Sequence, residues 1–335
     1  MTGEAISPVL RWIADLDGAG PLPGYPTRLT VAVRQLARAD FDAGAVGRAI
    51  ATANDALTSR LLQLAEARLG PPPCPYAWLT LGSGGRREES LHSDQDNAVA
   101  YREAAAGPYF AELADIIVAG LAAAGLPRCP GGYVATRWRY PLAEWERIFR
   151  RWVEQPEPQA LVEAEVLLDF RAVHGGLSPA PLDRILRGAA DQRRFTIQMA
   201  RAAVSFAPPL GLFGRLRTRH GDLDLKRAGI AAIVLLARLY ALAAGSDARS
   251  TADRLAAAAQ AGTLSRDGAS RLTQAHRVLT DLRLRAQVAA DGPPGNALRL
   301  ADLTPAERRA LLDALRAVHD LQDVTARRYR TDTVT

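Results

Sequence analysis

Two aspartates one residue apart, Asp94 and Asp96, stand just before the apolar run 97–101. On a strand, side chains alternate between the two faces, so these carboxylates would point the same way and Gln95 the opposite way. Two carboxylates this close repel each other unless a cation lies between them. Mg²⁺ typically takes one or two protein carboxylates together with substrate phosphates. The pair therefore predicts a site for a hard divalent metal, Mg²⁺ or Mn²⁺, held by Asp94 and Asp96.

A glycine-rich run, Gly82-Ser83-Gly84-Gly85, precedes the aspartates and is followed by Arg86. Such a turn can expose backbone N–H groups and let a phosphate chain approach without a Cβ in the way, and Arg86 adds a positive charge. Taken alone, a glycine run is usually a flexible turn, and an Asp-x-Asp is usually a solvated strand end or a helix cap. Joined at this spacing between two apolar runs, they favour a site for a metal-bound nucleoside triphosphate.

The flanking segments predict the elements that position these residues. Apolar residues recur at helical spacing, or form short buried runs bounded by turn residues. The predicted elements are one or two helices over 26–70, strands over 76–82, 97–101 and 132–138, and a helix over 108–124. The region 71–140 is therefore predicted to be a small mixed α/β unit.

From residue 141 the pattern stays helical almost to the end of the chain. The predicted helices cover 141–153, 159–173, 179–204, 224–244, 250–261, 265–290 and 304–327, the last starting at a Thr-Pro pair. The predicted fold class is therefore α+β. A small mixed-sheet domain over 71–175 follows an N-terminal helical segment over 1–70 and precedes an all-helical C-terminal domain over 176–335.

Composition narrows the class of protein. The net charge of +6 is interleaved with acids rather than gathered into a block, which disfavours a nucleic-acid partner. We expect no segment with the roughly 18 apolar residues of a membrane span, and the first residues lack a secretory pattern, so we expect a cytoplasmic protein without a membrane partner. Cys74 and Cys129 fit no metal-ligand spacing, and the turn residues after Cys129 explain its segment without a role for the thiol.

The motif string resembles known nucleotidyltransferases. The Gly-Ser pair, ten intervening residues and Asp-x-Asp are similar to the superfamily that includes DNA polymerase beta. The full string "GSGGRREESLHSDQDN" (82–97) more closely resembles a nucleotidyltransferase family often fused to CBS and cyclic-nucleotide-binding domains, itself similar to the nucleotidyltransferase domain of the PII-protein uridylyltransferase. The likeness continues through 129–138, 142–158, 167–175 and 224–242, and so covers about residues 75–325.

The resemblance implies a Mg²⁺- or Mn²⁺-dependent transfer of a nucleoside monophosphate from an NTP to a protein or small-molecule acceptor, in a regulatory role. It implies that the nucleotide is bound by Gly82, Ser83, Gly85, Arg86 and Glu88. A nucleotide sensor or scaffold that kept the pocket without turnover is the alternative. The choice of nucleotide, the acceptor, the role of residues 1–70 and the formation of a homo-oligomer stay open.

The superfamily normally uses a third carboxylate, and two residues are candidates for it. Asp169, in "LLDFRAV", matches the family but falls in a helical pattern, where an Asp-x-Arg pair also suits a structural ion pair. Glu88 lies in the glycine-rich loop, where it would also suit orienting Arg86.

Lys226 is the single lysine in a chain with 42 lysines and arginines. An ammonium group is a compact point charge that approaches a phosphate end-on, whereas guanidinium is a wide planar fork. The resemblance implies that Lys226 reaches across a cleft to the triphosphate, with Asp224 nearby. The competing interpretation is that Asp222 or Asp224 is a simple helix N-cap.

Overall fold

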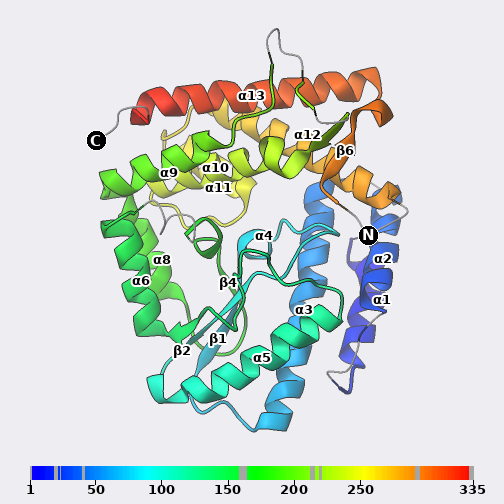
Figure 1. Cartoon of the computed structure of the whole chain (residues 1–335), viewed down its shortest axis with the longest axis vertical. Helices are drawn as coiled ribbons and strands as arrows, with labels where there is room; N and C mark the ends of the chain where they lie inside the picture. Colours follow the sequence, from blue (N-terminus) through cyan, green and yellow to red (C-terminus); the bar gives the residue numbers. More distant parts are fainter. Residues whose placement is uncertain are drawn as a thin grey trace. The chain divides into compact units, whose positions relative to one another are not determined.

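The computed structural model describes residues 2–18, 22, 24–39, 42–157, 164–211, 216–218, 221–290 and 295–331 (Figure 1). The chain forms two compact units. The first unit comprises Met1–Phe149 and Val162–Asp183, and the second comprises Arg150–Leu161 and Arg184–Thr335.

A four-stranded mixed sheet lies in the first unit, in the order β3-β2-β1-β4. Its strands are β1 (Tyr76–Thr80), β2 (Asn97–Tyr101), β3 (Arg139–Pro141) and β4 (Arg171–His174). The central strand β1 runs antiparallel to both β2 and β4, and β2 runs parallel to β3. Strands β1 and β2 are almost entirely buried, which agrees with their apolar sequences. The α+β fold class with a small mixed sheet is therefore confirmed.

Helices pack around this sheet in the first unit. They are α1 (Thr2–Ala14), α2 (Tyr25–Ala39), α3 (Ala43–Leu69), the one-turn α4 (Gly82–Arg86), η1 (Ala104–Ala106), α5 (Gly107–Ala123) and the start of α6 (Leu142–Glu154). Helix α3 contacts α1, α2, α5 and β4, and its buried face carries Ile50, Leu57 and Leu61. The helical N-terminal segment is thus part of the same compact unit as the sheet.

Helix α5 is long and apolar. Residues 104–123, which include η1, form the one described helical stretch whose length and composition would let it cross a membrane. The prediction that the chain has no segment with the length and composition of a membrane span was therefore wrong. In this structure α5 packs against α3 and β3, and Phe110, Leu113 and Ile117 are fully buried.

Helix α6 starts as predicted and packs through an aromatic stripe. Trp145 and Phe149 are buried, and the Trp145 indole N–H donates to the carbonyl of Val99 on β2 at 2.9 Å. The first turns of α6 are thereby joined to the sheet.

The second unit is mainly helical. Its helices are the end of α8 (Ala180–Arg187), η2 (Gly188–Asp191), α9 (Arg193–Ser205), the π-helical turn η4 (Lys226–Ile230), α10 (Ala231–Ala243), α11 (Thr251–Gln260), α12 (Arg266–Ala289), η5 (Leu300–Asp302) and α13 (Pro305–Tyr329). Helix α10 is apolar apart from the buried Arg238 and packs against α9 and α11, and α12 packs along α13. The predicted Thr-Pro start of the last helix is confirmed by a capping box between Thr304 and Glu307.

Four local predictions were wrong. The strand expected over 132–138 is a series of turns, and β3 follows it at 139–141. The helix expected over 159–173 ends before β4, and its residues 159–163 lie outside the described part of the chain. The helix expected over 179–204 is divided into α8, η2 and α9. The C-terminal region also contains a two-stranded antiparallel ribbon of β5 (Asp222–Asp224) and β6 (Ala297–Arg299), so it is not purely helical.

Candidate active site

The glycine-rich run forms the one-turn helix α4 rather than an open loop. Gly82 has a φ of +52°, which an L side chain rarely adopts. A Cβ on Gly84 would overlap the Thr80 hydroxyl, and a Cβ on Gly85 would overlap the backbone carbonyl of Asp169. These glycines are therefore required for the close approach of β1, α4 and the chain entering β4.

The two aspartates lie just before β2 rather than on it, because the strand begins at Asn97. The predicted alternation of side chains still holds. The Gln95 amide donates to the carbonyls of Val118 and Leu126, both at 3.1 Å. Asn97 donates to Gln95 and accepts from the Ala135 N–H at 2.7 Å. Gln95 and Asn97 thus bind this segment to the protein interior.

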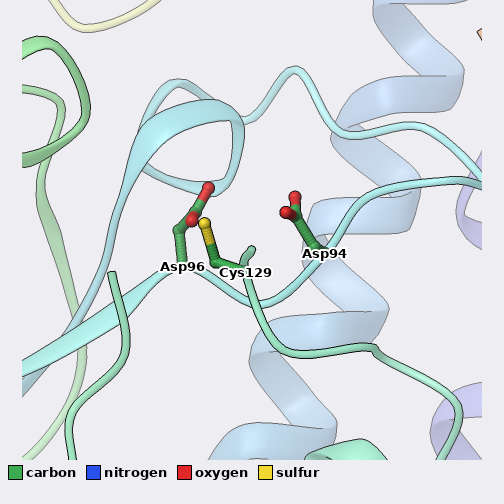
Figure 2. A group of neighbouring side chains, drawn as sticks. All are labelled: Asp94, Asp96 and Cys129. Atoms are coloured by element: carbon green, nitrogen blue, oxygen red, sulfur yellow. The ribbon is translucent and has the colours of Figure 1, made fainter. Parts of the chain in front are cut away.

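Asp94, Asp96 and Cys129 gather their side chains in one place, as Figure 2 shows. One oxygen from each carboxylate and the Cys129 sulfur all lie within 4.8 Å of one another. Gly82 borders the cluster, since a Cβ there would stand 3.0 Å from an Asp96 carboxylate oxygen. Burial, followed by the charge of Asp96 and the hydrogen bond to it, raises the pKa of the Cys129 thiol to about 12.

These residues fit a divalent metal ion. Carboxylate oxygens are the donors that Mg²⁺ and Mn²⁺ prefer, and both predicted ligands face one point. Among the described residues, Asp94, Asp96 and Cys129 form a group of acidic and cysteine side chains that lie close enough to share an ion. The predicted metal pair Asp94 and Asp96 is thus brought together, and a thiol is added to it.

Arg86 is held by two carboxylates in the first unit. Its guanidinium lies 2.8 Å from Glu88 and 2.5 Å from Asp169, and the Asp169 side chain has no exposed surface. Burial lowers the pKa of Arg86, but Asp169 and then Glu88 raise it, and the net result is a pKa above the usual value. Glu88 therefore orients Arg86, as one interpretation of the sequence expected. Asp169 lies in the turn before β4, not in a helix, and its ion-pair partner is Arg86 rather than Arg171.

Helix α3 contributes side chains to the same site. A small cavity of about 30 Å³ is lined by Asn54 and Thr58 of α3 together with Asp94, Asp96 and Glu89. The Asn54 amide donates to Glu89 at 2.9 Å and accepts from the Tyr25 hydroxyl at 2.5 Å. The sequence placed residues 1–70 in helices but did not connect them with the aspartates.

Glu89 was missed as a residue of this site. Its pKa is raised to about 7, mainly by burial. The hydrogen bond from Asn54 and the charge of Arg171 oppose the rise, whereas the charges of Asp55 and Asp96 add to it. Its neighbour Glu88 drew attention through the motif. A signal for Glu89 was present in the sequence, because two glutamates are adjacent in this loop. Glu88 pairs with Arg86, and Glu89 accepts a hydrogen bond from Asn54 instead.

A second ion pair, between Arg171 and Asp55, also fixes the position of α4. Arg171 on β4 contacts Asp55 on α3 at 2.9 Å and donates to the Gly84 carbonyl at 3.1 Å. Arg87 also approaches Asp55, at 3.5 Å, and ends α4 in the left-handed conformation. The turn is thus attached to α3 and β4 by charged side chains.

Lys226 and Asp224 belong to the second unit. Lys226 is exposed and opens the π-helical turn η4, a rare helix type often found at functional sites. Asp224 accepts a hydrogen bond from the Arg227 N–H at 3.1 Å, so it caps that turn. The cap that was the competing interpretation is present, and the phosphate contacts of both residues stay predictions.

Comparison with known proteins identifies the family. Residues 27–159 match the family model described as "Putative nucleotidyltransferase DUF294", and residues 193–329 match "Putative nucleotidyltransferase substrate binding domain". No curated protein matches the chain. The first match contains the glycine turn, both aspartates, Glu89 and Cys129, and the second contains Lys226. Together the two matches cover most of the sequence, and the chain belongs to this family of nucleotidyltransferases.

Proposed function

We propose that this protein is a cytoplasmic, Mg²⁺-dependent enzyme, with Mn²⁺ as a substitute, that moves a nucleoside monophosphate from an NTP to a regulatory acceptor. The acceptor is a protein side chain or a small molecule. One observation carries the proposal: the carboxylates of Asp94 and Asp96 lie together beside a glycine turn. Hydrogen bonds of Gln95 and Asn97 to the protein interior fix the segment that carries them.

Different residues of the first unit bind the metal, admit the phosphates and support the glycine turn. Asp94 and Asp96 would hold the metal, which would supply positive charge to stabilise the phosphates. Gly82 and Ser83 leave room for the phosphates to approach the α4 turn. Arg86 holds that turn in place through Glu88 and Asp169. Catalysis of this kind depends mainly on positioning and electrostatics.

The proposed reaction is an in-line displacement. The acceptor hydroxyl oxygen forms a bond to the α-phosphorus while the bond from that phosphorus to the α–β bridging oxygen breaks. Pyrophosphate leaves, and the acceptor proton passes to solvent. Residues 193–329 match the family model of a substrate-binding domain, which supports selection of the acceptor by the second unit.

The test is calorimetric binding of ATP, GTP, CTP and UTP, each with and without Mg²⁺. The wild type is compared with Asp94→Asn/Asp96→Asn and with a matched control, Asp247→Asn/Asp313→Asn, which changes two exposed aspartates in surface ion pairs. We expect Mg²⁺-dependent binding of one nucleotide that is lost in the first variant and kept in the control. Absence of binding by the folded wild type would reject the proposal. A Lys226→Gln variant in the same assay tests the predicted phosphate contact.

A non-catalytic nucleotide sensor is the second candidate. It is favoured by one observation, that the cluster around Asp94 and Asp96 contains two carboxylates while Asp169 is committed to Arg86. Pyrophosphate release from the bound NTP, measured with a cell extract as the source of acceptor, separates the two. Release above the level of the Asp94→Asn/Asp96→Asn variant supports the enzyme, and binding without release supports the sensor.

A further inference from the structure

Cys129 comes from a part of the chain remote from the aspartates, and the backbone brings it to them. The Gln95 N–H donates to the Pro127 carbonyl and the Asn97 N–H donates to the Tyr133 carbonyl, both at 2.9 Å. Gln95 also pairs with Arg128 in an isolated parallel bridge. The segment that carries the thiol is therefore attached on both sides of Cys129 to the segment that carries Asp94 and Asp96.

The turn after Cys129 keeps the thiol beside the carboxylates. The Gly132 N–H donates to the Cys129 carbonyl at 2.9 Å, which closes a tight turn. A Cβ on Gly131 would overlap the Tyr133 ring and would stand 3.6 Å from the Cys129 sulfur. The turn chemistry predicted from the sequence is present, and it places the sulfur in the cluster.

The other acids of the motif face different partners. Glu88 and Asp169 are both paired with Arg86, and Glu89 accepts from Asn54. The Cys129 sulfur, by contrast, lies within 4.8 Å of one carboxylate oxygen of Asp94 and one of Asp96. Three donors bound to one ion at roughly 2.0–2.3 Å each also lie within this distance of one another.

We propose that the Cys129 sulfur is the third protein donor to the metal held by Asp94 and Asp96, which makes a site of two oxygens and one sulfur. The inference rests on the proposed function, in which these aspartates hold a divalent ion. When the sulfur binds the ion its S–H bond breaks and the proton passes to solvent. Thiolate suits Zn²⁺ and Co²⁺, whereas Mg²⁺ takes oxygen ligands. The thiolate therefore adds affinity for Zn²⁺ and Co²⁺, which compete with Mg²⁺ for the two aspartates.

The test uses Co²⁺ as the probe, because a cobalt–thiolate bond gives a charge-transfer absorption in the near ultraviolet. The full-length wild type is titrated with Co²⁺ beside Cys129→Ser, Cys74→Ser and Asp94→Asn/Asp96→Asn. Cys74 is the matched control, since it is buried and its sulfur accepts from the Glu103 N–H. We expect the absorption in the wild type and in Cys74→Ser, and its loss in the other two variants.

Calorimetry with the metals alone gives a second measurement. We expect Zn²⁺ affinity to fall at least tenfold in Cys129→Ser while Mg²⁺ affinity changes less than twofold. A missing cobalt–thiolate absorption in the wild type, or equal Zn²⁺ affinity in wild type and Cys129→Ser, overturns the role of Cys129. If Mg²⁺-dependent NTP binding still requires the aspartates in that case, the proposed function survives. If neither metals nor NTP require the aspartates, the proposed function fails as well.

Discussion

The guanidinium of Arg86 on α4 lies 2.5 Å from the carboxylate of Asp169, a residue 83 positions later in the chain and without exposed surface. The pair joins the glycine turn to the start of β4. It also commits the buried carboxylate of Asp169 to an ion pair. A residue that the sequence offered as a third metal ligand is thereby placed where it supports the turn.

Replacing Asp169 by Asn should destabilise the protein strongly. The variant leaves the buried Arg86 charge paired with Glu88, and breaking a buried ion pair costs about 3 kcal/mol or more. Urea unfolding measures the loss. The control Asp313→Asn, in an exposed pair with Arg316, should change stability by less than about 0.5 kcal/mol. A stable Asp169→Asn protein that lost only Mg²⁺-dependent activity would instead make Asp169 a metal ligand.

Replacing Gly85 by Ala should be costly although the change is one methyl group. The new Cβ would overlap the Asp169 carbonyl, and relieving the overlap must move β4 or α4. We expect a loss of about 2–3 kcal/mol in the free energy of unfolding. Gly176→Ala is the matched control, because nothing lies within 4 Å of its Cβ. Equal stability of the two variants would show that α4 and β4 are not in close contact.

Glu89 should make stability depend on pH. Its pKa of about 7 in the folded protein lies above the ordinary value of 4.5, so the folded state keeps a proton that the unfolded chain releases. Stability from this group is present below about pH 4.5 and is lost as the pH rises through about 7.

The variant Glu89→Gln keeps the shape and removes the charge. Between about pH 5 and about pH 8 the wild type should lose on the order of 2 kcal/mol more stability than Glu89→Gln. Urea unfolding at both pH values measures the difference. The Asn54 amide, Asp55, Arg171 and Asp96 all remain in place in this variant. Parallel pH dependence in the two proteins would contradict the assignment.

Asn97 should be needed to hold the aspartate segment. It is buried, and Asn97→Ala leaves both the Ala135 N–H and the Gln95 amide oxygen without their partner. We expect a loss of about 2–3 kcal/mol in stability, together with weaker Mg²⁺-dependent NTP binding at a temperature where the variant is folded. Gln260→Ala, at the exposed end of α11, is the control for both measurements. Unchanged NTP affinity would mean that Asp94 and Asp96 do not depend on this anchor.

Part of the fold was predictable because its signals are local. Residues 76–80 and 97–101 are short apolar runs between turn residues, and both became central strands. Thr304 and Pro305 predict the start of α13, where Thr304 forms a capping box with Glu307, three positions later. Strand β4 was missed because Arg171–His174 is short and partly exposed, and its apolar neighbours fit helical spacing equally well. The same ambiguity hid the turn that holds Asp169.

The sequence by itself determined the family, the sheet's two central strands, and the presence of Asp94 and Asp96 beside a glycine turn. Those features depend on residues close together in the chain, where spacing limits geometry. The tertiary structure decided which remote residues lie at the aspartates and the glycine turn: Cys129 from the loop after α5, Asn54 from α3, and Asp169 from the turn before β4. Such neighbours are set by how helices and strands pack against each other, and no pattern within a single segment encodes that packing.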